Sequence, residues 1–277
     1  MKFKRSERLI DMTNYLLEHP HELVPLTYFA EKYGSAKSSI SEDLGIIKET
    51  FETRGIGVLQ TVPGAAGGVK FHVHVGEEEA TALIEDLCTI FASPERLLPG
   101  GYLYLNDILG NPAILRKVGR VMASVYAKQD IDAVMTVATK GIPIAYAVAG
   151  FLNVPVVIVR RDPKVTEGST VSINYVSGST KRIQTMVLSK RSLPDRSNVL
   201  IVDDFMKAGG TINGMIDLLK EFNATVAGIA VLVESEETEE RLVDDYTSLV
   251  RLSNVDVKDK KITVSYGNYF TKNKPTR

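Results

Sequence analysis

The stretch that most constrains the fold of this chain runs from Val199 to Thr211 and reads VLIVDDFMKAGGT. The four apolar residues 199–202 predict a buried parallel strand, because such runs are typical of strands covered on both faces. Two adjacent carboxylates, Asp203 and Asp204, come next, followed by small residues and a segment whose apolar spacing predicts a helix from Thr211. Ligands of α/β sheets bind beyond the carboxyl ends of strands. The sequence therefore predicts an α/β fold with a ligand site directly after residue 202.

The residue types at this site predict a ligand that combines a ribose, a phosphate and Mg²⁺. Backbone N–H groups from Ala208 to Thr211 can converge on a phosphate, and the positive end of the following helix favours an anion there. Asp203 and Asp204 would repel an anion, so we expect them to hold sugar hydroxyls or a cation that itself holds phosphate. The alternative is a tight strand-to-helix connection that merely needs glycines.

This stretch resembles the phosphoribosyl diphosphate (PRPP) signature of the type I phosphoribosyltransferases. In that family the acidic pair contacts the ribose hydroxyls and the small-residue loop binds the 5′-phosphate. The resemblance assigns PRPP binding here to Asp203, Asp204, Phe205, Met206, Lys207, Ala208, Gly209, Gly210 and Thr211.

The composition is that of an ordinary globular protein long enough for two domains. The chain has 277 residues, of which 44% are hydrophobic and 24% charged. Its net charge of −1 provides no overall basic field for a nucleic acid. Cys88 is the only cysteine and lies in an apolar-periodic run, so we expect a buried thiol in a reducing cytoplasm. The basic start is not followed by a long apolar run, and it predicts neither a signal peptide nor a membrane span.

Residues 1–75 have the order of a winged helix-turn-helix DNA-binding domain. Apolar residues recur at helical spacing in three segments, 6–18, 25–33 and 35–51, with Pro20 expected to end the first and Ser35 to cap the third. Two extended runs, 56–62 and 69–75, then flank turn-forming residues. In such modules the third helix enters the major groove and the hairpin wing lies along the backbone or minor groove.

The candidate DNA contacts lie on a basic N-terminal arm, at the start of the third helix and on the wing. Short polar side chains permit close approach to phosphates and base edges. The candidates are Lys2, Lys4, Arg5, Arg8, Lys37, Ser38, Ser39, Ser41, Gly64 and Lys70. Residues 1–75 contain nine Lys or Arg and nine Asp or Glu, so binding depends on how these charges are segregated. A winged helix that binds protein instead of DNA is the alternative.

Residues 76–277 predict a parallel sheet flanked by helices. Helices are expected at 77–91, 114–128, 142–152 and 211–221, and strands at 133–137, 156–159, 199–202 and 227–233. The loop after strand 133–137 again joins a strand end to a helix. The resemblance implies that this loop binds pyrophosphate, and its residues are Ala138, Thr139, Lys140 and Gly141.

The resemblance implies two further elements around the ligand. A polar segment at 160–170 matches the lid that folds over PRPP, from which Arg161 and Lys164 reach the diphosphate. Tyr102 is expected in the hood, the part of these enzymes that holds the base, where its ring covers the ligand. A solvated hairpin loop and a packed aromatic side chain are the alternatives. In the adenine branch of the family a Glu-Tyr pair in the lid contributes to catalysis, whereas the matching positions here hold Val176 and Ser177. This difference favours a site that binds PRPP without turning it over.

A winged helix-turn-helix joined to a type I phosphoribosyltransferase fold resembles the purine operon repressors of Gram-positive bacteria over essentially the whole chain. The resemblance implies a cytoplasmic homodimer that binds operator DNA upstream of purine synthesis and salvage genes, with PRPP as the effector that lowers DNA affinity. PRPP would carry Mg²⁺ with it, so no direct metal ligand and no catalytic residue is expected, and guanosine polyphosphates are possible competing effectors. An active purine phosphoribosyltransferase with an appended regulatory domain is the alternative.

Overall fold

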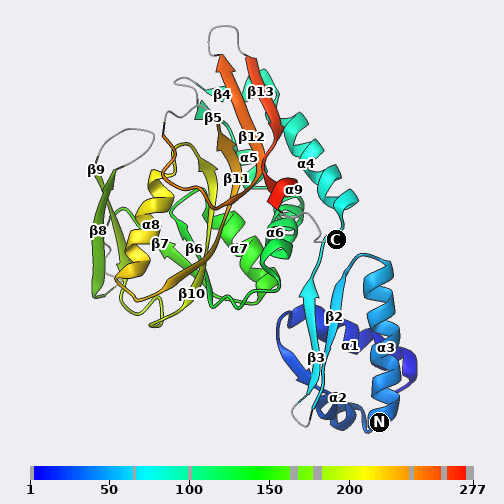
Figure 1. Ribbon diagram of the computed structural model, residues 1–277. Coiled ribbons are helices and arrows are strands. Elements are labelled where there is room, and N and C mark those ends of the chain that lie inside the picture. Colours follow the sequence, from blue (N-terminus) through cyan, green and yellow to red (C-terminus); the bar gives the residue numbers. More distant parts are fainter. Residues whose placement is uncertain are drawn as a thin grey trace.

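The structure is a computed structural model that describes residues 3–64, 67–98, 102–162, 168–176, 183–236, 240–256 and 261–272. Three residues of the predicted lid and DNA-binding arm lie outside this part of the chain: Lys2, Lys164 and Ser177. The side chain of Tyr102 is also outside the description. Figure 1 shows a small N-terminal module connected by one strand to a larger α/β part.

The N-terminal module contains the predicted helices and hairpin, and one additional short strand. Its elements are α1 (Arg5–Glu18), β1 (Leu23–Pro25), α2 (Leu26–Tyr33), α3 (Lys37–Thr53), β2 (Gly57–Val62) and β3 (Gly68–Val73). The strands form an antiparallel sheet in the order β1-β3-β2. β1 was not predicted, because three residues are too few to show an alternating pattern.

The core of this module forms as the helical spacing predicts. Ile40, Leu44, Ile47 and Phe51 are all buried along one face of α3 and pack in one cluster with Phe71 of the hairpin. The expected helix ends need correction. Ser35 does not cap α3: the N-cap is Ala36, and the Ser35 hydroxyl donates to the carbonyl of Tyr33 at 3.4 Å. Pro25 is the N-cap of α2 and ends β1, whereas α1 ends at Glu18, just before Pro20, as predicted.

The larger part is built on a six-stranded sheet with the order β13-β12-β11-β10-β6-β7. Neighbouring strands from β12 to β7 are parallel, and β13 is antiparallel to β12. The sheet strands are β6 (Ala133–Val137), β7 (Val156–Val159), β10 (Asn198–Met206), β11 (Thr225–Ser235), β12 (Thr247–Asp256) and β13 (Lys261–Tyr266). The helices are α4 (Glu77–Phe91), α5 (Asn106–Leu109), α6 (Pro112–Tyr126), α7 (Ile142–Leu152), α8 (Gly210–Lys220) and α9 (Tyr269–Lys272). A 3-10 turn at Pro94–Arg96 and two short hairpins complete it, β4 (Leu97–Leu98) with β5 (Tyr102–Leu103) and β8 (Thr170–Val176) with β9 (Ile183–Ser189).

Helices cover both faces of this sheet, as the sequence predicts. Leu200 and Val202 of β10 belong to a core cluster that also contains residues of α4, α6 and α7. Val199 and Ile201 point to the opposite face and pack in a second cluster with α8 and the β8-β9 hairpin. Because successive residues of a strand face opposite sides, one apolar run supplies both cores. Figure 1 shows α7 and α8 on either side of the central strands.

Contacts near the start of α4 connect the two parts. His72 Nδ1 lies 3.1 Å from the carbonyl oxygen of Ala127, directly after α6. Arg120 of α6 pairs with Glu79 at 2.5 Å and donates to the backbone carbonyl of His74 at 3.1 Å. These contacts hold β3 against α6. No helix in the described part of the chain is long and apolar enough to cross a bilayer.

Candidate ligand site and nucleic-acid interface

The acidic pair lies within β10 and not after it. β10 continues to Met206, and Asp203 is paired with Val231 of β11 and Met206 with Glu234. The prediction that the strand ends at Val202 was therefore wrong: β11 is long enough to offer the backbone of residues 203–206 a hydrogen-bonding neighbour. β6 and β10 are neighbours in the sheet, but β6 is followed by α7 on one face and β10 by α8 on the other. The strand order reverses between these two strands. Ligands of open α/β sheets bind at such a point.

The small-residue loop connects β10 to α8 by a left-handed turn. Gly209 is the N-cap of α8 with φ +84°, and a Cβ there would lie 3.1 Å from Val243 Cγ2. Glycine is therefore required both by the backbone and by the space. The helix begins at Gly210, one residue earlier than predicted. The loop presents its backbone N–H groups at a helix N-terminus, the arrangement that binds phosphate in many folds.

Two residues predicted to belong to this loop belong to the strand instead. Met206 is 2% exposed and packs in the core with α8, and Phe205 is half-buried against the opposite cluster. The extended backbone of β10 directs their side chains into these two cores. Lys207 is exposed and begins the connection; residues 207–209 together with Gly210, the first residue of α8, are called loop 207–210 below.

The two predicted ligand loops meet at Gly141. A Cβ on Gly141 would lie 2.1 Å from Thr136 Oγ1 and 3.0 Å from Asp203 Oδ1. The loop after β6 contains a cis peptide bond between Ala138 and Thr139, and Lys140 is exposed. The structure thus brings the predicted pyrophosphate loop against the predicted ribose-binding acid, from positions more than sixty residues apart in the sequence.

The acidic pair is buried in surroundings that disfavour two negative charges. The Asp204 N–H donates to Asp203 Oδ1 at 2.9 Å. Burial raises the pKa of Asp203 well above its usual range and Asp204 raises it further, while the charge of Arg161 acts in the opposite direction. Burial also raises the pKa of Asp204, while the hydrogen bond to Asp203 and the charge of Lys140 lower it. Within the described residues neither carboxylate forms an ion pair. Buried carboxylates with perturbed pKa values that are left for a ligand are typical of a functional site.

The described part of the predicted lid forms a hairpin that packs on α8. β8 and β9 pair from Thr170 with Ser189 to Val176 with Ile183, and a Cβ on Gly214 of α8 would lie 2.9 Å from Tyr175 Cγ. Val176 of β8 is 56% exposed.

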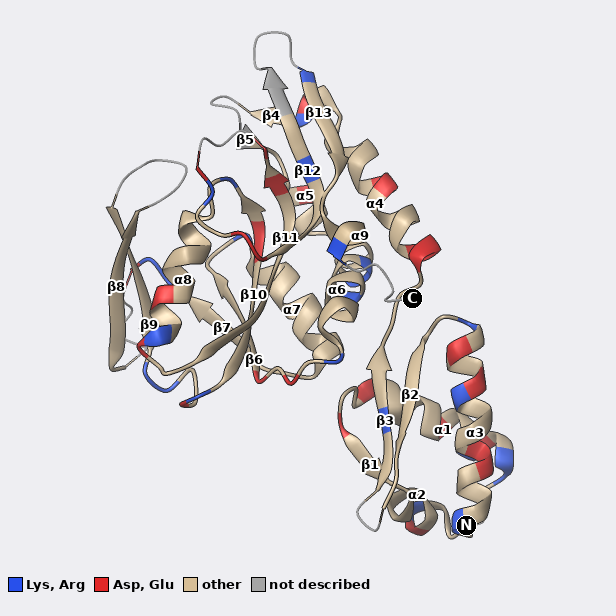
Figure 2. Ribbon diagram, viewed as in Figure 1, with Lys and Arg blue, Asp and Glu red and all other residues tan. Residues whose placement is uncertain are grey.

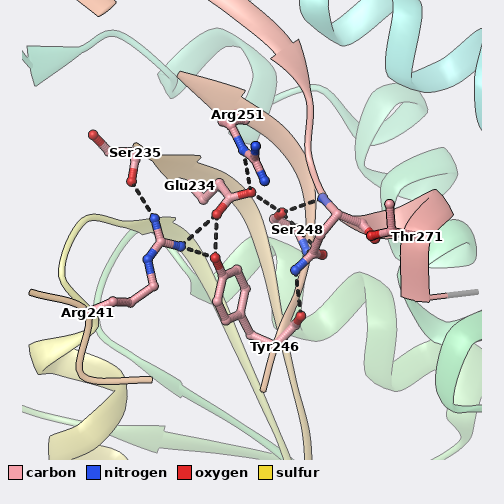
Figure 3. Close-up of polar contacts among 8 residues, drawn as sticks. Glu234, Ser235, Arg241, Tyr246, Ser248, Arg251 and Thr271 are labelled. Atoms are coloured by element: carbon pink, nitrogen blue, oxygen red, sulfur yellow. Dashed lines mark hydrogen bonds and ion pairs between the residues drawn. The ribbon is translucent and has the colours of Figure 1, made fainter. Parts of the chain in front are cut away.

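The sequence reasoning missed a buried carboxylate at the end of the neighbouring strand. Glu234 of β11 is 1% exposed and accepts hydrogen bonds from Arg241, Tyr246, Ser248 and Arg251 (Figure 3). It is the first acid after the apolar run 227–233, the same pattern that identified Asp203.

The start of α3 is accessible, as a recognition helix requires. Lys37, Ser38 and Ser41 are exposed and Ser39 is half-buried, while the wing residue Gly64 is exposed with φ +113°. Lys37 lies in the first turn of α3, whereas Lys48 stands among the acidic residues Glu42, Asp43, Glu49 and Glu52, and Figure 2 shows both signs of charge along the helix. The charges of α3 are therefore mixed beyond its first turn, and Lys37 is the basic group at its exposed N-terminal end.

The predicted basic arm is in part a structural element. Arg5 and Arg8 lie in the first turns of α1, and both guanidinium groups donate to Asp43 of α3, at 2.8 Å and at 2.7 and 3.0 Å. The side chain of Asp43 is 1% exposed and that of Arg8 13%. Arg8 therefore joins α1 to α3 and is not a free DNA contact, whereas Arg5 remains 54% exposed and Lys4 is exposed.

Lys70 lies on a strand of the wing, as predicted, but on the face that meets the second part of the chain. It lies in the middle of β3, paired with Leu23 and Gln60, because the alternation of β3 buries Val69 and Phe71 and directs Lys70 to the other face. That face borders a cavity of about 460 Å³ between the two parts, lined by Pro20, His21, Glu22, Lys70 and residues 129–132 and 152–154. Lys70 therefore faces the second part of the chain.

Comparisons with known proteins find relatives for both parts of the chain. Residues 4–73 match the family model of the bacterial purine repressor N-terminal domain, and residues 105–271 match the phosphoribosyl transferase domain. The chain is 67% identical over 270 residues to the purine biosynthesis transcriptional repressor PurR of Bacillus subtilis (strain 168), covering 98% of this chain and 95% of that protein. The chain belongs to the bacterial purine repressor family.

Relatives in this purine repressor family include activators as well as repressors. The purine biosynthesis transcriptional activator PurR of Lactococcus lactis subsp. lactis (strain IL1403) is 51% identical over 267 residues, which cover 96% of this chain and 98% of that protein. Adenine phosphoribosyltransferase from Thermoanaerobacter pseudethanolicus superposes with a TM-score of 0.53 at 20% identity, covering 61% of this chain and 99% of that one. This likeness shows the fold of the second part. The predicted family and the predicted fold class are both confirmed.

Proposed function

We propose that this purine repressor family member is a cytoplasmic, homodimeric repressor of purine synthesis and salvage genes that releases operator DNA when PRPP binds. The observation that supports the proposal is the close approach of Gly141 to Asp203, which brings the predicted pyrophosphate loop against the buried acidic pair that precedes loop 207–210. PRPP has a diphosphate at one end of its ribose and a 5′-phosphate at the other. These three groups match the order of the predicted pyrophosphate loop, the acidic pair and loop 207–210.

Each end of PRPP has a matching element. Loop 207–210 and the N-terminus of α8 suit the 5′-phosphate, and Asp203 and Asp204 suit the ribose hydroxyls. The charges of Arg161 and Lys140 lower the pKa of Asp203 and Asp204 respectively, and we assign these two basic groups to the diphosphate. Mg²⁺ prefers oxygen ligands and commonly bridges phosphates, so it fits when carried in with the diphosphate.

The effect of PRPP on DNA follows from linkage. If PRPP binds the free dimer more tightly than the DNA-bound dimer, it must lower the DNA affinity by the same factor. The negative charge of PRPP and a shift of the winged helices relative to each other are the two physical sources of such coupling. Guanosine polyphosphates also join phosphates to a ribose, so we propose that they compete for the same loops.

We further propose that the site does not catalyse transfer. Val176 is an apolar, exposed residue where the adenine enzymes use a catalytic pair. The match of residues 105–271 to the phosphoribosyl transferase domain keeps the active enzyme as the competing function. Incubation with Mg²⁺, PRPP and each purine base separates the two, since only the enzyme would release pyrophosphate.

The central experiment measures operator binding by fluorescence anisotropy with and without PRPP and Mg²⁺. At low salt concentration, DNA from upstream of purine synthesis and salvage genes is expected to bind to the protein, and PRPP is expected to release it. Light scattering on the same sample reports the dimer. Binding that PRPP leaves unchanged contradicts the effector role, and equal binding to unrelated DNA contradicts the operator role.

A further inference from the structure

Glu234 lies one strand away from the candidate phosphate loop and has four donors around one buried carboxylate. Arg241 Nη1 donates to Oε2 at 2.7 Å and the Tyr246 hydroxyl donates to the same oxygen, while Ser248 and Arg251 donate to Oε1 at 2.8 and 3.1 Å. Figure 3 shows the two arginines approaching the carboxylate from opposite sides. A buried charge with this many partners holds a rigid geometry, because loss of one partner leaves a desolvated group unpaired.

The Oε2 side of this network holds the segment 240–246. Besides Glu234, the Arg241 guanidinium donates to the Tyr246 hydroxyl and, through Nη2, to the carbonyl of Ser235 at 2.9 Å. These bonds tie both ends of the segment to the end of β11. The Oε1 side differs, since Arg251 and Ser248 both belong to β12.

The same segment forms the outer wall of the phosphate loop. The N–H of Leu242, next to Arg241, donates to the carbonyl of Ala208 at 2.9 Å. Val243 packs over Gly209, where a Cβ would lie 3.1 Å from Val243 Cγ2. Residues 242 and 243 thus contact the loop through both backbone and side chain, at Ala208 and at Gly209, the N-cap of α8.

We propose that Glu234 and Arg241 are positioning residues that fix the backbone of loop 207–210 through segment 240–246. A loop that binds an anion by its N–H groups gains affinity when those groups are already aimed before the ligand arrives. The proposal rests on the proposed function in one respect, that the ligand of this loop is the 5′-phosphate of PRPP. The bracing of the loop itself concerns the free protein.

Two arginines on one carboxylate provide a matched pair of variants. Arg241→Lys keeps the charge but loses the planar fork that reaches Glu234, Tyr246 and Ser235 together. Arg251→Lys makes the same chemical change at the other oxygen and leaves segment 240–246 attached. Calorimetry with PRPP and Mg²⁺ on the full chain is expected to give a Kd about tenfold higher for Arg241→Lys, the size seen when a supporting contact behind a binding group is lost. Arg251→Lys is expected to stay within about twofold of the original protein, and operator affinity without PRPP is expected to be unchanged in both.

Hydrogen exchange on the ligand-free protein tests the bracing without any ligand. Arg241→Lys is expected to speed exchange in peptides that cover 207–210 and to leave peptides of α7 unchanged, whereas a general loss of stability would speed both. Unchanged exchange at 207–210, or equal effects of the two lysine variants, overturns the inference. Should Arg241→Lys fail to fold, Tyr246→Phe removes a donor from the same oxygen and is expected to act in the same direction. If the original protein does not bind PRPP, the proposed function fails, and the exchange result still decides the bracing.

Discussion

Gly141 and Asp203 are so close that a methyl group on Gly141 would meet the Asp203 carboxylate at 3.0 Å and the buried hydroxyl of Thr136 at 2.1 Å. One residue belongs to the loop after β6 and the other to β10, and their contact closes the point where the strand order reverses. A site made of two loops depends on this spacing.

We therefore expect Gly141→Ala to abolish PRPP binding and to destabilise the protein by about 1–3 kcal/mol, since the added methyl group must displace β6 or β10. Gly150 of α7 is the matched control: it is exposed, a Cβ there meets nothing within 4 Å, and alanine favours a helix. Thermal unfolding and calorimetry measure both variants. Normal PRPP affinity in Gly141→Ala would show that the two loops are not used together.

The acidic pair is expected to lower the stability of the folded protein at neutral pH and to be needed for PRPP binding. Because the folded pKa of Asp203 and Asp204 is raised above the unfolded value, the folded protein holds more protons, and stability falls as pH rises through the unfolded pKa toward the folded one. Asp203→Asn removes this penalty. We expect it to melt higher than the original protein at pH 7, with the difference shrinking toward pH 4, while PRPP no longer releases operator DNA.

Asp204→Asn is expected to behave in the same way, and operator affinity without PRPP is the control for both variants. PRPP release that survives in the double variant would exclude the pair from effector recognition. A melting temperature lower than that of the original protein at pH 7 would contradict the argument from burial.

The two basic groups of the N-terminal module are expected to act on DNA by different routes. Lys37→Ala should lower the slope of log affinity against log salt by about one unit without changing stability, because an exposed lysine contributes one phosphate contact. Arg8→Ala leaves the buried Asp43 with one partner fewer and should cost about 3 kcal/mol of stability in this module, where breaking a buried pair typically costs 3–5.

Urea unfolding and salt titrations of DNA binding separate these effects. PRPP binding should remain normal in both variants, since both changes lie in the other part of the chain. A stable Arg8→Ala that loses only salt dependence would return Arg8 to the DNA-contacting arm.

The imidazole at the junction of the two parts is expected to make stability fall in acid. Burial first, then the charges of His72 and Lys70, lower the pKa of His21 to about 4. Above the unfolded pKa of about 6.5 the imidazole is neutral in both states and does not affect the free energy of unfolding. As pH falls from there toward 4 the unfolded chain takes up a proton that the folded protein does not, so the folded protein loses stability. His21→Asn, which tolerates the φ of +63° at this position, should reduce the loss of stability between pH 7 and pH 5. Equal losses in both proteins, measured by urea unfolding, would assign the effect to other groups.

Local sequence was sufficient for most elements because their periods are set by short-range geometry. The apolar spacing of α3 predicted its buried face, and the run 199–202 with its two acids predicted a strand that carries a site at its carboxyl end. The alternation of residues 69–75 predicted a half-buried strand. The faces of β3 were available from the same alternation, but which face meets the second part was not.

The positions that depended on partners far along the chain were decided only by the tertiary structure. β10 extends through the acidic pair because β11 pairs with it, and Arg8 is held by an acid 35 residues away. Glu234 lies among four donors that only the sheet and its following segment bring together. The ligand loops themselves could be predicted from VLIVDDFMKAGGT, since a strand, an acidic pair and a glycine turn are local features. Their meeting at Gly141 and Asp203 required the parallel register of β6 and β10, because contacts between distant segments are set by packing and not by local propensity.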